Sequence, residues 1–120
     1  MSRARLTLLL ERMRQASLDA HGLATSVDRA TFLKDMMVQR AVGMSLLMAA
    51  EAATQLMDRY PDFVADHPEF PWAEIRGMRN RMAHGYFEIN LERVWDTATI
   101  EAPELVDKID AILHWRAEGE

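Results

Sequence analysis

The sequence predicts an all-α fold, an antiparallel bundle of about five helices in which the second helix is unusually long. Apolar residues recur at steps of three and four along most of the 120 residues. No segment shows the alternating apolar and polar pattern of a half-buried strand, and no internal repeat interrupts the chain. Because domains of roughly 100 to 150 residues are the commonest, we expect residues 1–120 to form a single domain.

The first two helices are predicted by their apolar stripes and by the residues at their ends. The first runs from Leu6 to about His21, and Gly22 is expected to end it. Ser26 is expected to cap a second helix that continues to about Asp58. The predicted buried stripe of this helix comprises Phe32, Met36, Gln39, Val42, Leu46, Ala49, Ala53 and Leu56.

Prolines and caps divide the second half of the chain. A connection with little regular structure is punctuated by Pro61, Pro68 and Pro71. Pro71 suits the first position of a third helix, which Gly85 ends. Asn90 is expected to cap a fourth helix that continues to residue 100, and Pro103 opens a fifth.

Composition excludes several classes of function. The chain has no cysteine, so a disulfide framework, an iron–sulfur cluster and a thiol nucleophile are excluded. The apolar run at residues 6–10 is shorter than the roughly seven residues that a secretory signal needs. The longest apolar stretch, residues 41–53, is interrupted by Glu51 and falls short of the ~20 residues that span a bilayer. We therefore expect a cytoplasmic protein without membrane contact.

The net charge of −5 argues against a broad nucleic-acid-binding surface, because such surfaces are usually basic. The charge is unevenly distributed, however. Residues 1–29 carry +2, residues 30–87 carry −1, and residues 88–120 carry −6. The acidic C-terminal third could dock a basic partner, and a local basic patch elsewhere is compatible with the total.

Residues 71–86 carry the most chemical information. Around one helix end this stretch gathers three arginines, an asparagine, a histidine and a tyrosine: Arg76, Arg79, Arg81, Asn80, His84 and Tyr86. The chain has no glycine-rich phosphate loop, zinc-protease motif or serine nucleophile elbow. The other histidines, His21, His67 and His114, are isolated in the sequence, so we expect neither a metal site nor a cofactor.

An arginine and a histidine suffice for one reaction on RNA. Guanidinium groups bind phosphate oxygens through paired N–H donors, and imidazole exchanges protons near neutral pH. His84 could act as acid or base while a 2′-hydroxyl attacks its own phosphodiester, with Arg79 steadying the charge on phosphorus. Asn80 lies four residues before His84, so its amide could orient the ring. Arg76 and Arg81 are the candidate contacts to RNA phosphates.

Two features leave other interpretations open. Arg79 and His84 are five residues apart, about 140° around an ideal helix. They converge only if the helix end is distorted or a second subunit completes the cleft. Arg79 could instead be a buried partner for Glu51, with the other two arginines on a solvated face and Tyr86 half-buried in packing.

Residues 79–86, Arg-Asn-Arg-Met-Ala-His-Gly-Tyr, resemble the Arg-x4-His-x-Tyr signature of the HepT-like toxins, a branch of the HEPN superfamily. Other segments resemble landmarks of this family in order, over about residues 30–113: Phe32-Leu33-Lys34-Asp35, Gln39-Arg40-Ala41-Val42, Glu51-Ala52, Phe70-Pro71-Trp72, Ile75-Arg76-Gly77-Met78, Val94-Trp95 and Ala102-Pro103-Glu104-Leu105. Ala50 departs from the pattern, which has glycine before the glutamate; the difference concerns packing rather than the motif.

The resemblance implies an HEPN-type bundle and a metal-independent endoribonuclease toxin of a bacterial toxin–antitoxin system. It implies a homodimer whose two motifs line one cleft, with Arg79 and His84 as the catalytic pair and Asn80 as their support. It also implies an antitoxin partner, a minimal nucleotidyltransferase of the MntA type, which inactivates the toxin by AMPylation of Tyr86.

Two rival functions use the same residues differently. A non-catalytic HEPN dimer would bind nucleotide or a nucleotidyltransferase partner without cutting RNA. A purely structural helical dimer would tolerate the replacement of His84 by alanine. The complete pair of Arg79 and His84 favours the enzyme.

Overall fold

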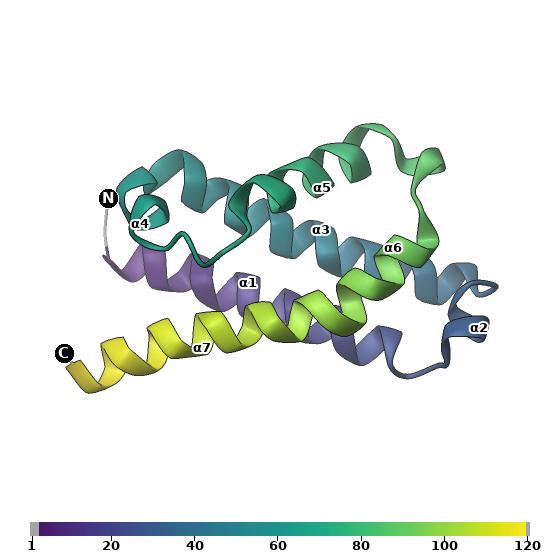
Figure 1. The fold of residues 1–120 in the computed structure, drawn as a ribbon, viewed down its shortest axis with the longest axis horizontal. Helices are drawn as coiled ribbons and strands as arrows, with labels where there is room; N and C mark the ends of the chain where they lie inside the picture. The colour runs from purple at the N-terminus through teal and green to yellow at the C-terminus, as the bar shows by residue number, and fades with distance from the viewer. Residues whose placement is uncertain (1–2, 120) are drawn as a thin grey trace.

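A computed structural model describes the backbone of residues 3–119 and the side chains of residues 3–114. Every regular element in this part of the chain is a helix, which confirms the all-α class. Four long helices form the body: α1 (Arg3–Ala24), α3 (Met36–Arg59), α5 (Trp72–His84) and α7 (Ala102–Gly119). Each packs antiparallel to its neighbour, α3 against both α1 and α5, and α7 against α1 (Figure 1).

The predicted long second helix is broken near its start. A short helix, α2 (Arg29–Phe32), is separated from α3 by a turn at residues 33–35. Asp28 caps α2 and Asp35 caps α3, in place of the predicted Ser26. Each of these carboxylates accepts a hydrogen bond from the backbone N–H three residues further on, which satisfies a donor that the helix leaves free. The hydrogen bonds also hold the pKa of Asp28 below its ordinary value.

Two smaller predictions at helix ends are also wrong. α1 continues through Gly22, which has no positive φ, and ends at Ala24. Continuation buries Ala24 in a cluster with Phe32 and Val42, and this burial outweighs the weak helix propensity of glycine. Met36 is exposed rather than part of the buried stripe, because it is the first residue of α3.

The connection between α3 and α5 contains a short helix, α4 (Pro61–Asp66), where little regular structure was predicted. The fourth and fifth predicted helices are joined end to end. α6 (Leu91–Asp96), capped by Asn90 as predicted, continues through a π-helical turn at Thr97–Glu101 into α7. The Ala102 N–H donates to the Thr97 carbonyl five residues back, so the helix continues past Pro103 rather than starting there.

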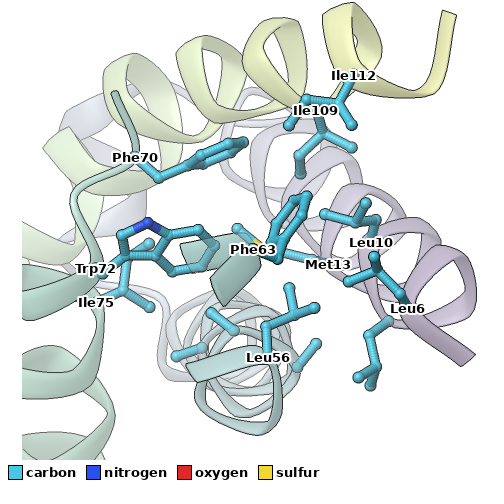
Figure 2. Close-up of a cluster of buried hydrophobic side chains, with 14 residues drawn as sticks. Leu6, Leu10, Met13, Leu56, Phe63, Phe70, Trp72, Ile75, Ile109 and Ile112 are labelled. Atoms are coloured by element: carbon cyan, nitrogen blue, oxygen red, sulfur yellow. The ribbon is translucent and has the colours of Figure 1, made fainter. Parts of the chain in front are cut away.

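The main core fills the space between α1, α3, α5 and α7 (Figure 2). α4, the connection that follows it and the start of α5 supply one aromatic residue each: Phe63, Phe70 and Trp72. Leu56 of α3 and Ile109 of α7 meet them from the other helices. Each large apolar side chain that is buried in this way contributes roughly 1.5–3 kcal/mol. A second cluster around Phe32 fixes the far end of α5 through Met82, so that both ends of this helix are anchored.

Candidate active site

The motif lies at the C-terminal end of α5, and the start of this helix is held firmly. The Trp72 indole Nε1 donates to the His67 carbonyl over 2.9 Å, which fixes the entry into α5. The His67 ring is hydrogen-bonded to the Glu69 carboxylate, which lowers the pKa of Glu69. Ile75 and Met82 bury one side of the helix against α3. The residues of the motif therefore project from a rigid support.

α5 ends at His84, and Gly85 forms the predicted C-cap. The Gly85 N–H donates to the Arg81 carbonyl over 2.7 Å, and a Cβ at Gly85 would lie 3.2 Å from that oxygen. The chain then makes one 3-10 turn, η1 (Tyr86–Glu88), and η1 joins α6 through Ile89 and Asn90. This tight exit leaves His84 exposed and Tyr86 45% exposed. Tyr86 is therefore partly accessible, with its ring edge-on to that of Phe87.

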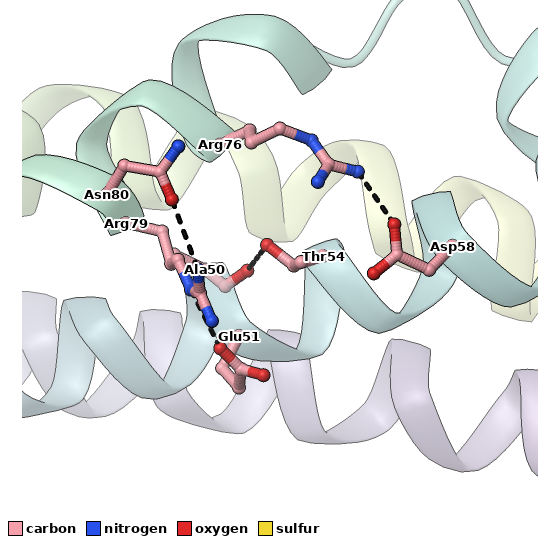
Figure 3. Close-up of polar contacts among 7 residues, drawn as sticks. All are labelled: Ala50, Glu51, Thr54, Asp58, Arg76, Arg79 and Asn80. Carbon is pink, nitrogen blue, oxygen red and sulfur yellow. Dashed lines mark hydrogen bonds and ion pairs between the residues drawn. The ribbon is translucent and has the colours of Figure 1, made fainter. Parts of the chain in front are cut away.

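Arg79 is oriented by two side-chain hydrogen bonds (Figure 3). Its Nε donates to Glu51 Oε2 of α3 over 3.0 Å, and its Nη1 donates to Asn80 Oδ1 over 3.1 Å. The sequence had left this pairing with Glu51 open, although both side chains are partly exposed rather than buried. A guanidinium carries five N–H donors, so Arg79 keeps donors for a phosphate while Glu51 fixes its direction.

Asn80 does not support His84 in the way we expected. Its amide oxygen accepts from Arg79 instead. Within residues 3–114, His84 has no hydrogen-bond or ion-pair partner. Arg79 faces α3, and His84 lies about 140° further around α5. One chain therefore holds the two motif residues on different sides of the same helix.

The two candidate phosphate contacts differ from each other. Arg76 is paired with Asp58 of α3 over 3.0 Å, parallel to the pair that Arg79 makes (Figure 3). Arg81 is exposed and has no partner within the described side chains. Arg81 shares a hollow near Gly85 with Arg93 of α6, a residue outside the predicted site. The sequence does offer one signal that points to Arg93. It is a basic residue close after the Asn90 cap, and only a short link separates it from the motif.

An apolar stripe is exposed on α3 beside the motif. It consists of Met37, Met44 and Met48, which we call the methionine stripe; their side chains are 81%, 58% and 56% exposed. Their spacing of seven and four residues places them on one side of the helix, followed by Glu51. The stripe therefore ends at the carboxylate that orients Arg79. Exposed apolar side chains that share one side of a helix make this side a candidate interaction surface.

The remaining histidines have structural contacts or stand apart. His21 Nδ1 lies 3.1 Å from the Ala98 carbonyl, and His67 bonds Glu69. No group of three metal-ligating side chains occurs among the described residues. None of the helices described is both long enough and apolar enough to cross a bilayer.

Comparisons with known proteins place the chain in a family. A family model described as Ribonuclease HepT-like matches residues 10–112. A protein of Caldanaerobacter subterraneus subsp. tengcongensis that carries the name "Putative RNase" is 38% identical over 82 residues, 68% of this chain and 70% of the relative. A protein of Thermococcus cleftensis named "Probable ribonuclease HepT" is 33% identical over 81 residues, 68% of this chain and 71% of the relative.

A third relative, from Methanocaldococcus jannaschii and also named as an RNase, is 35% identical over 82 residues, 68% of this chain and 65% of the relative. No solved structure matches the chain. The family match covers all of the helices that build the motif, from α3 to the start of α7, and includes Arg79, His84 and Tyr86. The chain belongs to the HepT-like ribonuclease family.

Proposed function

We propose that this protein is an endoribonuclease toxin that cleaves RNA by transesterification without a metal ion. The observation that carries the proposal is the state of the motif on α5. Arg79 is oriented by Glu51 and Asn80 and keeps free donors, while the exposed His84 has no competing partner among the described residues. Both lie in the region that matches ribonuclease relatives.

The chemistry follows from these two groups. A base removes the proton of an RNA 2′-hydroxyl, and the oxygen attacks the adjacent phosphorus. A bond forms between O2′ and phosphorus, the bond to O5′ breaks, and an acid protonates the leaving O5′. The products are a 2′,3′-cyclic phosphate and a 5′-hydroxyl. His84 transfers protons in this step, and Arg79 stabilises the negative charge that develops on the phosphoryl oxygens.

Two copies of the chain form the working site. Arg79 and His84 leave α5 in directions about 140° apart, so a second copy that faces the first brings the Arg79 of one copy toward the His84 of the other. The methionine stripe supplies the contact surface. Arg40 lies before Met44 and Met48, and Glu51 follows them, so two antiparallel α3 helices would bring opposite charges together.

Tyr86 is the proposed site of control. A nucleotidyltransferase antitoxin, encoded beside this toxin, transfers AMP from ATP to the Tyr86 Oη. The phenol oxygen attacks the α-phosphorus, pyrophosphate leaves, and the phenol proton passes to solvent. The 45% exposure of Tyr86 supports this role, because a transferase must reach the hydroxyl. The added phosphate and adenosine would cover the end of α5 beside His84 and repel an RNA phosphate.

The function is tested by incubating the purified protein with single-stranded RNA. Wild type should leave 2′,3′-cyclic phosphate ends, and the cleavage should persist in excess EDTA. His84→Ala should lower the rate about 10²–10⁴-fold, because it removes the group that transfers protons. His114→Ala, which replaces another exposed histidine, should leave the rate unchanged. Equal rates for wild type and His84→Ala would exclude this enzyme and favour a binding or structural dimer.

The modification is tested separately with the purified neighbouring nucleotidyltransferase and ATP. Intact-protein mass spectrometry should show the addition of AMP to wild type and to Tyr60→Phe, and none to Tyr86→Phe. Tyr60, which is half-buried, is the only other tyrosine of the chain and therefore serves as the matched control. Persistence of the added mass in Tyr86→Phe would exclude Tyr86 as the acceptor.

A further inference from the structure

A second hollow lies on the opposite side of α5 from Arg79 and Glu51. It is a groove of about 380 Å³ between α5 and the continuous helix formed by the π-helical turn and α7. This volume is within the range of roughly 300–1,000 Å³ that is usual for small-ligand sites. The floor is apolar and comes from three helices: Leu46, Ala49 and Ala50 of α3, Ile75 and Met78 of α5, and Leu105 of α7.

The groove exists because small side chains meet a widened helix. α5 packs on α3, whereas α7 packs on α1. Between α5 and α7, the small side chains of Ala49 and Ala50 on α3 leave space that forms the groove. Thr97 and Glu101, the first and last residues of the π-helical turn, line the side of the groove. Single π-helical turns inside α-helices are rare and occur frequently at functional sites.

The rim of the groove carries basic and acidic side chains, and its two arginines have no partner in the part of the chain that the structure describes. Arg81 and Arg93 line this groove and also the hollow of about 430 Å³ beside Gly85, so they stand at the end nearest the motif. Neither guanidinium has a partner among the described side chains. The other charged groups of the rim are Glu74, Glu101, Glu104 and Lys108. The groove thus combines an apolar floor, two unpartnered guanidiniums next to the motif, and three carboxylates.

We propose that this groove binds one nucleotide of the RNA substrate, with its base on the apolar floor and its phosphate between Arg81 and Arg93. A base has two apolar faces, for which the side chains of Ile75 and Met78 are suitable neighbours. Paired guanidiniums are the usual protein ligands of a phosphate. An apolar peptide would fill the floor but would leave both arginines without an anion. The proposal rests on the proposed ribonuclease function and adds a position for the chain of the RNA.

The carboxylates of the rim set a preference among bases. Exocyclic amino groups donate hydrogen bonds to carboxylates, and adenine, cytosine and guanine carry such groups while uracil does not. Glu74 and Glu101 are acceptors within the groove. The subsite should therefore take adenosine 5′-monophosphate more tightly than uridine 5′-monophosphate, and inorganic phosphate should leave the apolar floor unaffected.

The test uses the full chain with ¹³C-methyl-labelled methionine, because methionines report separately on the two sides of α5. Met78 lies in the floor of the groove, whereas Met44 lies on the exposed stripe of α3. Titration with adenosine 5′-monophosphate should shift the Met78 methyl signal and leave Met44 in place. Uridine 5′-monophosphate should bind at least threefold more weakly. An unmoved Met78 at millimolar nucleotide, or a shift that phosphate alone reproduces, would overturn the proposal.

The basic end is tested by variants. Arg93→Gln should weaken the binding of adenosine 5′-monophosphate about tenfold, because it removes one charge-assisted contact. Arg59→Gln, which alters an exposed arginine at the end of α3, is the matched control and should bind as wild type does. Circular dichroism should show the same helix content in all three proteins. Equal affinity of Arg93→Gln and wild type would contradict the assignment.

A titration with single-stranded RNA shows whether the groove binds a nucleotide within an RNA chain or only the free mononucleotide. With the His84→Ala protein, RNA should shift Met78 and compete with adenosine 5′-monophosphate; binding of the free nucleotide without such competition would overturn the placement of the groove on the RNA path. In cleavage, Arg93→Gln should raise KM and leave kcat near that of wild type. If the protein does not bind the nucleotide but its cleavage of RNA still depends on His84, only the subsite is refuted. If cleavage does not depend on His84, the proposed function itself is refuted.

Discussion

The two sides of α5 differ in how their basic side chains are held. On the side that faces α3, Arg76 and Arg79 each pair with a carboxylate over 3.0 Å. On the other side, Arg81 and His84 have no partner among the described residues. The same helix thus carries groups whose direction is fixed and groups that are available to a ligand.

This difference explains how a protein of net charge −5 can act on RNA. Pairing with α3 cancels part of the positive charge of α5, but it leaves N–H donors of Arg79 free and pointing in a defined direction. The unpaired side keeps its full charge for phosphates. We infer that orientation comes from the α3 side and attraction from the side that faces α6 and α7.

The largest effect is expected at the methionine stripe, where we propose that the α3 side meets a second copy. Replacing Met44 and Met48 together by glutamate places charges on the methionine stripe and should convert a dimer to a monomer, with cleavage reduced to that of His84→Ala. Size-exclusion chromatography with light scattering reports the mass. Ile100→Glu is the matched control, because Ile100 is 56% exposed, as Met48 is, but lies on the π-helical turn. A fully active monomer would refute the shared site.

The next effect separates the two arginines that face α3. Arg79→Gln should lower kcat about 10²-fold, since it removes a cation that stabilises the transition state. Arg76→Gln removes an equally short ion pair and should change kcat less than about threefold, because a phosphate contact made already in the bound substrate affects KM instead. Both ion pairs are partly exposed, so each variant should change the free energy of unfolding by at most about 1 kcal/mol. Similar losses of rate in the two variants would show that only the fold, and not the motif, is affected.

Removal of the orienting carboxylate should have an intermediate effect. Glu51→Ala leaves Arg79 charged but free to rotate, so we expect kcat to fall about tenfold while the affinity for RNA stays the same or rises. Glu51→Gln keeps a hydrogen-bond acceptor and should recover part of the loss. A wild-type rate in Glu51→Ala would mean that the ion pair has no role in positioning.

The smallest effect on cleavage is expected on the side of α5 that carries Arg81, which is unpartnered among the described residues. Gly77→Ala should raise the free energy of unfolding by about 1 kcal/mol, because alanine favours the helix interior. The new Cβ would lie 3.2 Å from Arg81 Nη1, and this unpartnered guanidinium can move away. We therefore expect a melting temperature higher by roughly 2–8 °C with nearly unchanged cleavage. A large loss of activity would show that Arg81 is held in place more tightly than the structure indicates.

Much of the fold could be predicted because apolar spacing and caps are local signals. The C-cap at Gly85, the N-cap at Asn90 and the end of α3 one residue after Asp58 were recognised in this way. The break before α3 was missed although Asp35 is a good cap, since the apolar stripe continues across the turn. Pro103 indicates a helix start when only the sequence is considered, because a π-helical turn has no local sequence signal.

The site could be predicted less completely than the fold. The residue types leave a pairing of Arg79 with Glu51 open as an alternative; the structure shows the pair, partly exposed rather than buried. The role of Asn80 did not follow, because spacing alone cannot decide which of two neighbours the amide bonds; its oxygen accepts a hydrogen bond from Arg79. Arg93 stands out little in the sequence, because it comes to line the same hollow as Arg81 only when the chain folds.

The most direct test of the shared site mixes two inactive chains. Arg79→Ala and His84→Ala proteins are co-refolded in equal amounts, and the cleavage rate is compared with that of each variant alone. If Arg79 of one copy acts with His84 of the other, each heterodimer contains one intact site, and the mixture should recover about a quarter of the wild-type rate. A mixture as inactive as its components would contradict a site built from two copies.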